Sequence, residues 1–204
     1  LASKLIRTAT FDEFHAANRT RGIVYLPTAS YIEMNEWTLP GPAAREYHSL
    51  LEDEKAAGRF ERRKPYLRGG IWRNFFSRYP ESNWMHKRML QVSNRFNALP
   101  KKQQTAERRE LLHRCQANDA YWHGLFGGLY LPHLRRAIWN NLLALEVELD
   151  ALAPRPAIER VDIDHDGAEE ICLRGHLLQA LVRNDGDAGI VEFDAFERAH
   201  NFGD

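Results

Sequence analysis

The segment 118–123, with the sequence NDAYWH, brings an amide, a carboxylate, an indole and an imidazole into two helical turns. Leu111, Leu112 and Cys115 precede it at helical spacing, so the pattern predicts one helix over residues 104–122. Residues three and four apart are neighbours on a helix surface. The helix is therefore predicted to end in a polar and aromatic cluster that continues its apolar face.

This predicted cluster consists of Asn118, Asp119, Trp122 and His123. Because the burial of an unpaired carboxylate is costly, we expect the helix face to open onto a polar cleft at Asp119. A flat aromatic ring beside hydrogen-bond acceptors suits the binding of a sugar. Glycines follow from residue 124 onward and would let the backbone approach a ligand closely. The chemistry indicated is carbohydrate binding.

A structural role explains the same residues about equally well. Asn118 and Asp119 would then bond the local backbone at a helix end, while Tyr121 and Trp122 would pack in the core. Trp37, one turn after a glutamate on a second predicted helix, has the same two interpretations. Trp139, beside the leucine stripe of its helix, is expected to pack in the core, whereas Trp72 and Trp84 would pack or line a groove.

Cofactors, nucleic acid and membranes are not indicated by the composition. The nine histidines form no pair four apart with an acid between them, and no Cys-x-x-Cys is present, so no metal is expected. The 28 basic residues balance 28 acidic ones, which argues against nucleic acid as a partner. No apolar run approaches the roughly 20 residues of a membrane span. Cys115 and Cys172 fall in helix-like and strand-like segments, so no disulfide is expected and a cytoplasmic location fits best.

Residues 1–40 have the pattern of the tail of an α/β domain. A capping box at Thr10 predicts a short helix that ends near Asn18. The apolar run Gly22–Leu26 predicts a buried strand, and residues 30–37 look helical. Helix, strand and helix in alternation are typical of an α/β fold, and we interpret the chain as a piece of a longer polypeptide.

Residues 41–153 have helical periodicity almost throughout, with a break at Gly69–Gly70, and this predicts a helical bundle. A first helix should begin at Pro42 and end near Ala57, ahead of a glycine. Pro80 and Pro132 should begin two more. The apolar stripes of these two are Met85, Met89, Val92 and Phe96, and Leu134, Ile138, Leu142, Leu145, Leu149 and Leu152.

Beyond residues 153–156 (APRP), the period changes to short alternating runs. Turn residues at 164–167 and 184–186 separate these runs, which predicts the first hairpins of an antiparallel β domain. The segment is too short to close a stable sandwich alone. The fold class predicted is therefore mainly α, a helical bundle followed by the first strands of an antiparallel β domain.

Three long stretches resemble glycoside hydrolase family 57, in its 4-α-glucanotransferase and α-amylase branch. They are residues 22–40 (GIVYLPTASYIEMNEWTLP), 68–88 (RGGIWRNFFSRYPESNWMHKR) and 115–136 (CQANDAYWHGLFGGLYLPHLRR). The resemblance implies three regions. Residues 1–40 would be the C-terminal remnant of an α/β barrel, residues 41–153 a helical middle domain, and residues 154–204 the start of a C-terminal β-sandwich domain.

The resemblance also implies retaining chemistry on α-1,4-glucans or maltooligosaccharides, with a Glu nucleophile and an Asp acid/base. Both belong to barrel motifs upstream of Leu1, so no catalytic residue is assigned here and the chain alone is expected to be inactive. In the family, the NDAYWHG motif lines donor-side sugar subsites. Carried over by position, Asp119 would bond glucosyl hydroxyls, Trp122 would stack on a sugar face and His123 would orient or bond nearby.

Asn118 and Trp37 are further substrate-binding candidates from the same resemblance. The rest of the parent chain, the barrel and the sandwich, would be the main protein partner, and homo-oligomerisation stays open. The alternative function is a non-catalytic helical module for glucan binding or subunit contacts. The sequence does not separate glucan transfer from hydrolysis.

Overall fold

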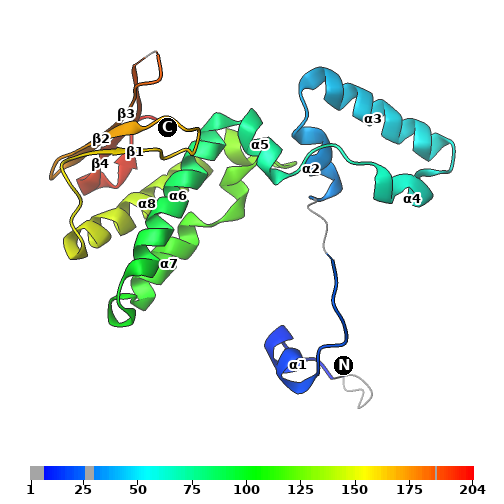
Figure 1. The fold of residues 1–204 in the computed structure, drawn as a ribbon, viewed down its shortest axis with the longest axis horizontal. Coiled ribbons are helices and arrows are strands. Elements are labelled where there is room, and N and C mark those ends of the chain that lie inside the picture. The colour runs from blue at the N-terminus through cyan, green and yellow to red at the C-terminus, as the bar shows by residue number, and fades with distance from the viewer. Residues whose placement is uncertain (1–6, 26–29, 187) are drawn as a thin grey trace.

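A computed structural model describes residues 7–25, 30–186 and 188–204 (Figure 1). The helices come first and an antiparallel sheet follows, as the sequence predicts. The α-helices are α1 (Phe11–Ala17), α2 (Ile32–Trp37), α3 (Gly41–Ala56), α4 (Phe60–Arg63), α5 (Trp72–Arg78), α6 (Pro80–Ala98), α7 (Ala106–Cys115) and α8 (Pro132–Leu152). Single turns of 3-10 helix are η1 (Lys64–Tyr66), η2 (Lys101–Gln103), η3 (Asn118–Tyr121), η4 (Gly128–Tyr130) and η5 (Phe196–Arg198).

The N-terminal part confirms the first predicted helix but not the predicted strand. Thr10 Oγ1 accepts a hydrogen bond from the Glu13 amide at 3.2 Å, and Glu13 Oε2 accepts one from the Thr10 amide at 2.9 Å. This capping box begins α1. Residues 22–25 form no strand, and Ile23 is 90% exposed. A lone extended segment lacks the ladder bonds of a sheet, and no described residue supplies them. Leu26 lies outside the described residues.

Helix α3 ends where the sequence predicts. The C-cap is Ala57, and Gly58 follows with a φ of +66°, a conformation that glycine adopts without a steric penalty. Near this end the buried carboxylate of Glu54 pairs with Arg59 (Nε–Oε2, 3.0 Å) and Arg63 (Nη1–Oε1, 2.7 Å). These pairs fix α4 against the end of α3.

Helices α6, α7 and α8 pack side by side as the predicted bundle (Figure 1). The stripe predicted for α6 is buried throughout, and most of the α8 stripe is buried as well. At the ends of α8, Leu134 is half-buried and Leu152 is 36% exposed. Proline begins both long helices, as predicted. Helix α7, however, ends at Cys115 and does not reach Trp122.

The sheet of the described residues has five antiparallel strands in the order β1-β2-β3-β4-β5. They are β1 (Ile158–Val161), β2 (Glu170–Arg174), β3 (Leu178–Arg183), β4 (Gly189–Ala195) and β5 (His200–Asn201). Cys172 and Leu181 pair across β2 and β3 and share one buried core with Leu145 and Leu149 of α8. The opposite face exposes apolar side chains, such as Ile158 at 68% and Ile190 at 66%.

The sheet therefore packs on the helical bundle through one of its faces. The division of the chain into domains at residues 40 and 153 stays a prediction. Within the described ranges, no helix combines the length and the apolarity that crossing a membrane requires.

Candidate functional site

Two segments far apart in the sequence bring their aromatic rings together. The Trp37 ring centroid lies 5.4 Å from that of Trp122 and 4.7 Å from that of His123. Tyr31 meets Trp122 edge-on at 5.4 Å, and Tyr130 stacks on His123 at 5.8 Å. We call these five residues the aromatic cluster. Tyr31 is 46% exposed and Tyr130 58%, while the other three rings are half-buried, so the cluster borders solvent.

The NDAYWH segment is not the last two turns of a long helix. Ala117, with an extended backbone, separates α7 from η3. The hydroxyl of Tyr121 donates to the carbonyl of Cys115, and the Tyr121 carbonyl accepts from the hydroxyl of Ser82 on α6. These bonds hold η3 as a separate turn. The prediction of one helix over residues 104–122 was wrong because tertiary bonds to α6 and to the end of α7 outweigh the continuing periodicity.

Trp122 follows η3 with an extended backbone, which turns its side chain away from the face of α7. The amide of Leu129 donates to the Trp122 carbonyl at 2.9 Å and closes the loop between them. A Cβ atom on Gly128 would lie 1.9 Å from the same carbonyl, and Gly128 also has a φ of +43°. Only glycine fits this position. Gly128 thus lets its own segment of the loop pack closely against the Trp122 carbonyl. The sequence had instead suggested that these glycines let the backbone approach a ligand.

The predicted polar residues lie on the solvent side of the NDAYWH segment. Asn118 and Asp119 are exposed. Asp119 lines a different concavity of about 290 Å³, against Ile138 and Asn141 of α8. Within the described ranges, the Asp119 carboxylate makes no hydrogen bond or ion pair. The structure therefore brings together the rings of Trp37, Trp122 and His123, while the exposed Asp119 borders a concavity that none of the three lines. A sugar-binding role for Asn118 and Asp119 stays a prediction.

Tyr121 takes the structural role that the sequence analysis left open for it. It is 4% exposed, and its burial raises the pKa of its hydroxyl. Cys115 is completely buried beneath it, and burial raises the pKa of this thiol to about 12. A protonated, buried thiol is a poor nucleophile. This side of the NDAYWH segment is core and not a reactive surface.

The imidazole of His123 is set up to stay neutral. Burial lowers its pKa, and the nearby positive charge of Arg78 lowers it further. A neutral imidazole offers one hydrogen-bond donor and one acceptor. Next to it, the Tyr79 hydroxyl accepts a bond from the Tyr130 hydroxyl at 3.3 Å, and burial together with this bond raises the Tyr79 pKa to about 12. The aromatic cluster itself consists of uncharged rings, hydroxyls and an imidazole, and the exposed guanidinium of Arg78 lies beside it.

Sequence reasoning missed the tyrosines of the cluster and their neighbour Tyr79. Tyr31 meets Trp122 only because α2 lies against the NDAYWH segment, and burial raises its pKa to about 12 with help from the charge of Glu33. The signal that could have identified these tyrosines was their position in the sequence. Tyr31, Tyr79 and Tyr130 each fall in one of the three family-like stretches, 22–40, 68–88 and 115–136.

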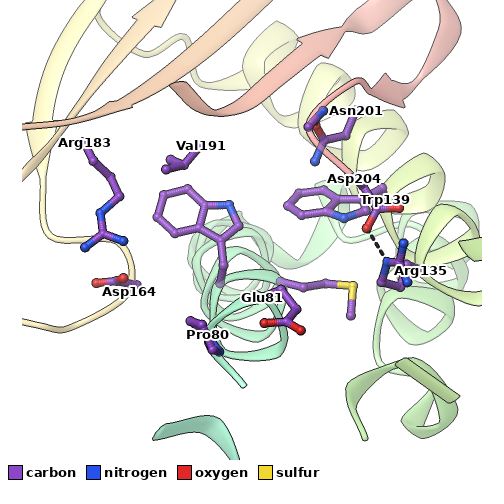
Figure 2. A pocket seen from close by; sticks show the side chains of 12 residues that line it. Pro80, Glu81, Arg135, Trp139, Asp164, Arg183, Val191, Asn201 and Asp204 are labelled. Carbon is purple, nitrogen blue, oxygen red and sulfur yellow. Dashed lines mark hydrogen bonds and ion pairs between the residues drawn. The ribbon is translucent and has the colours of Figure 1, made fainter. Parts of the chain in front are cut away.

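A second concavity, of about 220 Å³, lies where the helices meet the sheet (Figure 2). Its lining includes Trp84 and Trp139, which are 9% and 4% exposed and so pack mainly as core. At one end of the concavity, Arg135 Nε lies 2.6 Å from Asp204 Oδ1 (Figure 2). This concavity shares no residue with the aromatic cluster.

An acidic turn between β1 and β2 was not singled out from the sequence. Side-chain oxygens of Asp162, Asp164 and Asp166 lie within 4.8 Å of one another. Carboxylates of this kind are ligands for hard cations. The amides of Asp166 and Gly167 also donate to the Asp162 carboxylate at 3.1 Å, so the turn uses these oxygens itself. The spacing D-x-D-x-D-G was the visible signal. We assign no metal to it.

Comparison with protein families identifies the class of protein to which this chain belongs. The family model of the alpha-amylase/4-alpha-glucanotransferase middle domain matches residues 70–149. The model of the C-terminal domain of the same enzymes matches residues 162–204. The chain therefore belongs to the alpha-amylase/4-alpha-glucanotransferase family.

Individual relatives agree with this assignment. The chain is 45% identical over 199 residues to an alpha-amylase from Pyrococcus furiosus, and 40% identical over 203 residues to a 4-alpha-glucanotransferase from Thermococcus litoralis. These matches cover 98% and 100% of this chain and 29% of each relative. The crystal structure of a 4-alpha-glucanotransferase from Thermococcus litoralis superimposes with a TM-score of 0.78, over 98% of this chain and 30% of that one. The chain thus spans less than a third of its relatives' length.

Proposed function

We propose that this chain forms the helical wall of the glucan-binding cleft in a retaining enzyme of glycoside hydrolase family 57 that acts on α-1,4-glucans. The enzyme would be a 4-α-glucanotransferase or an α-amylase. The family membership and the names of the relatives support the substrate class. The observation that carries the proposal is the meeting of Trp37, Trp122 and His123 at a half-exposed surface built from two distant segments.

Each residue of this surface has a role that its chemistry supports. The indoles of Trp37 and Trp122 offer flat apolar faces to the C–H groups of a glucosyl ring. His123, kept neutral by burial, donates or accepts one bond to a sugar hydroxyl. The exposed Asn118 and Asp119 would bond hydroxyls of a longer glucan at the rim. The stacking rings and the neutral imidazole would bind a neutral polymer without desolvating a charge.

Catalysis is not assigned to this chain. In the proposal, the nucleophile and the acid/base come from a barrel encoded upstream, and the glucan lies between that barrel and this wall. Without the nucleophile no glycosyl intermediate can form. The 204-residue chain should therefore show neither transfer nor hydrolysis on maltooligosaccharides, and product formation seen by chromatography would refute this part of the proposal.

The two free, fully buried thiols support a cytoplasmic location for the enzyme, which we include in the proposal. The main protein partner would be the rest of the parent chain. No observation in the structure favours the alternative of a non-catalytic module.

The experiment is a titration of the chain with maltoheptaose, followed by tryptophan fluorescence or calorimetry. We expect weak binding, with a Kd of about 1 mM or above, since half of the cleft is absent. Trp122→Ala should abolish it, and Asp119→Ala should weaken it. The control is Tyr66→Ala, which removes an 82% exposed aromatic ring on η1, outside the cluster.

Binding that survives both Trp122→Ala and Asp119→Ala would place recognition elsewhere and refute the site. Circular dichroism of each variant separates loss of binding from loss of fold. Unfolding of Trp122→Ala would favour the structural role of that residue.

A further inference from the structure

Helix α2 carries Trp37 but is too short to be stable alone, since it has six residues. Its position must come from other segments. The buried Asn35 provides three contacts. Its carbonyl accepts from the Gly70 amide at 3.0 Å, its Oδ1 accepts from the Gly69 amide at 3.2 Å, and its Nδ2 donates to the Tyr31 carbonyl at 3.1 Å. Asn35 thus joins α2 to the Gly69–Gly70 segment through its backbone carbonyl and its side-chain amide.

This junction requires glycine on the other side. A Cβ atom on Gly69 would lie 2.1 Å from the Asn35 carbonyl oxygen, and one on Gly70 would lie 1.7 Å from Oγ1 of the buried Thr38. Neither distance can be tolerated, because the backbone of α2 or the buried Thr38 side chain would have to move. The two backbones pack directly against each other. The absence of side chains at residues 69 and 70 therefore sets the distance between α2 and the Gly69–Gly70 segment.

The C-terminal end of α2 is held by a cation. Nη1 of Arg78, the last residue of α5, donates to the carbonyl of Trp37 at 2.8 Å and also to the carbonyl of Leu39. A positive charge at the carbonyl end of a helix is favourable. The same guanidinium lies 5.4 Å from the Tyr79 ring, and Tyr79 meets His123 edge-on at 5.6 Å. Arg78 thus links the backbone of Trp37 to the His123 side of the aromatic cluster.

The apolar side of α2 completes the attachment. Met34 is fully buried and packs with Phe75 and Phe76 of α5. The amide of Trp72 donates to Ser30 Oγ at 2.9 Å and ties the start of α5 to the residues before α2. Helix α2 therefore packs on α5. The contacts at Asn35 and Arg78 fix the orientation of Trp37, the last residue of α2.

We propose that Asn35, Gly69, Gly70 and Arg78 are positioning residues that hold the Trp37 indole against Trp122 and His123 and thereby set the sugar-stacking surface. They act on the backbone of α2 and not through the stacking rings. This inference rests on the function proposed above, and it adds the residues that determine the geometry of the surface.

The test uses Arg78, because its side chain is at the surface and its removal should leave the fold intact. The 204-residue chain is labelled with 5-fluorotryptophan, and the Trp37 resonance is assigned by its loss in Trp37→Phe. In Arg78→Met we expect the 19F resonances of Trp37 and Trp122 to shift while that of Trp139, buried in the core between helices and sheet, stays unchanged. Maltoheptaose binding should weaken by about two- to tenfold, the range for the loss of one typical hydrogen bond.

Three further variants keep this test specific. Arg73→Met makes the same chemical change at an exposed position of the same helix and should leave the Trp37 resonance and the binding unchanged. Arg78→Lys keeps a cation near the Trp37 carbonyl and should restore both in part. Gly70→Ala should shift the Trp37 resonance in the same direction as Arg78→Met.

The results separate this inference from the proposed function. If the unmodified chain binds maltoheptaose and Arg78→Met binds it equally well, the inference is overturned and the proposed function stands. An unmoved Trp37 resonance in Arg78→Met also overturns it. If the unmodified chain does not bind, while Trp122→Ala and Arg78→Met are folded, the proposed site fails and the sugar role of the positioning residues fails with it.

Discussion

Arg88 on α6 and Glu192 on β4 form an ion pair, with Nε 2.9 Å from Oε1, in which neither side chain has any exposed surface, although 104 positions separate them. The same guanidinium pairs with Glu146 of α8 through Nη2 at 2.7 Å. The indole nitrogen of Trp84 donates to Glu192 at 2.7 Å. The bundle and the sheet therefore meet across a buried charged layer as well as an apolar core.

Replacing Arg88 by Met should strongly destabilise the chain. Glu146 and Glu192 would keep their buried carboxylates and lose their main cation, so we expect a loss of about 3–5 kcal/mol in the free energy of unfolding. Urea denaturation followed by circular dichroism measures it. Arg62→Met, at an exposed position of α4, is the control and should change little. Equal midpoints for the two variants would show that the ion pair does not hold the sheet on the bundle.

The carboxyl group of Asp194 should make stability depend on pH. Burial, reinforced by the negative charge of Glu192, raises its pKa to about 10 from an ordinary 3.8, and the positive charge of Arg88 opposes this. Gln179 Nε2 donates to Asp194 Oδ2 at 2.9 Å and also approaches Glu146 at 3.4 Å. The folded state holds a proton that the unfolded state releases, so stability should fall as the pH rises from about 4 to about 10.

Asp194→Asn keeps the shape of this side chain and removes its titration. The variant should therefore lose less stability between pH 6 and pH 9 than the unmodified chain, measured as the free energy of unfolding at both values. Asp12→Asn, on the exposed helix α1, is the matched control and should follow the unmodified chain. A pH slope unchanged by Asp194→Asn would mean that Asp194 is already ionised in the folded state.

Gly128→Ala should disturb the loop that presents Trp122. The new Cβ would meet the Trp122 carbonyl at 1.9 Å, and alanine would also be strained at a φ of +43°. We expect a loss of about 1–3 kcal/mol in the free energy of unfolding and a shift of tryptophan fluorescence. Gly22→Ala is the control, because a Cβ there meets nothing within 4 Å. A Gly128→Ala variant with unchanged stability would show that the loop relaxes freely.

The two thiols should be unreactive until the chain unfolds. Cys115 and Cys172 are both fully buried, and burial raises the pKa of each. Labelling with a thiol-specific chromogenic reagent at pH 8 should therefore be slow in buffer and should reach two thiols per chain in urea. Rapid labelling of either cysteine in buffer would indicate that the core opens locally.

Local signals determined the borders of most elements. The capping box at Thr10, the glycine after α3 and the prolines at the first positions of α6 and α8 act within one helical turn, so the sequence predicted these borders correctly. The alternation after residue 156 likewise predicted the antiparallel strands, because the side-chain period of a strand is local. The exposed segment 22–25 differs, since a strand needs a partner that its own sequence does not provide.

The candidate site was predicted in its residue types and not in its arrangement. Trp37, Trp122 and His123 were named from the sequence, and the structure brings them together. A continuous helix was one of the two grounds for grouping Asp119 with Trp122, and the bonds of Tyr121 to Cys115 and Ser82 end that helix early. The other ground, the resemblance of the NDAYWHG motif to the family, stays a prediction.

The sequence alone therefore determined most of the helical and extended stretches, which of their faces are apolar, and the family to which the chain is similar. Only the tertiary structure decided that Trp37 meets Trp122, and that Arg88 lies between Glu146 and Glu192. The physical reason is that periodicity reports whether a face is buried, whereas the partner of that face depends on how separate elements pack.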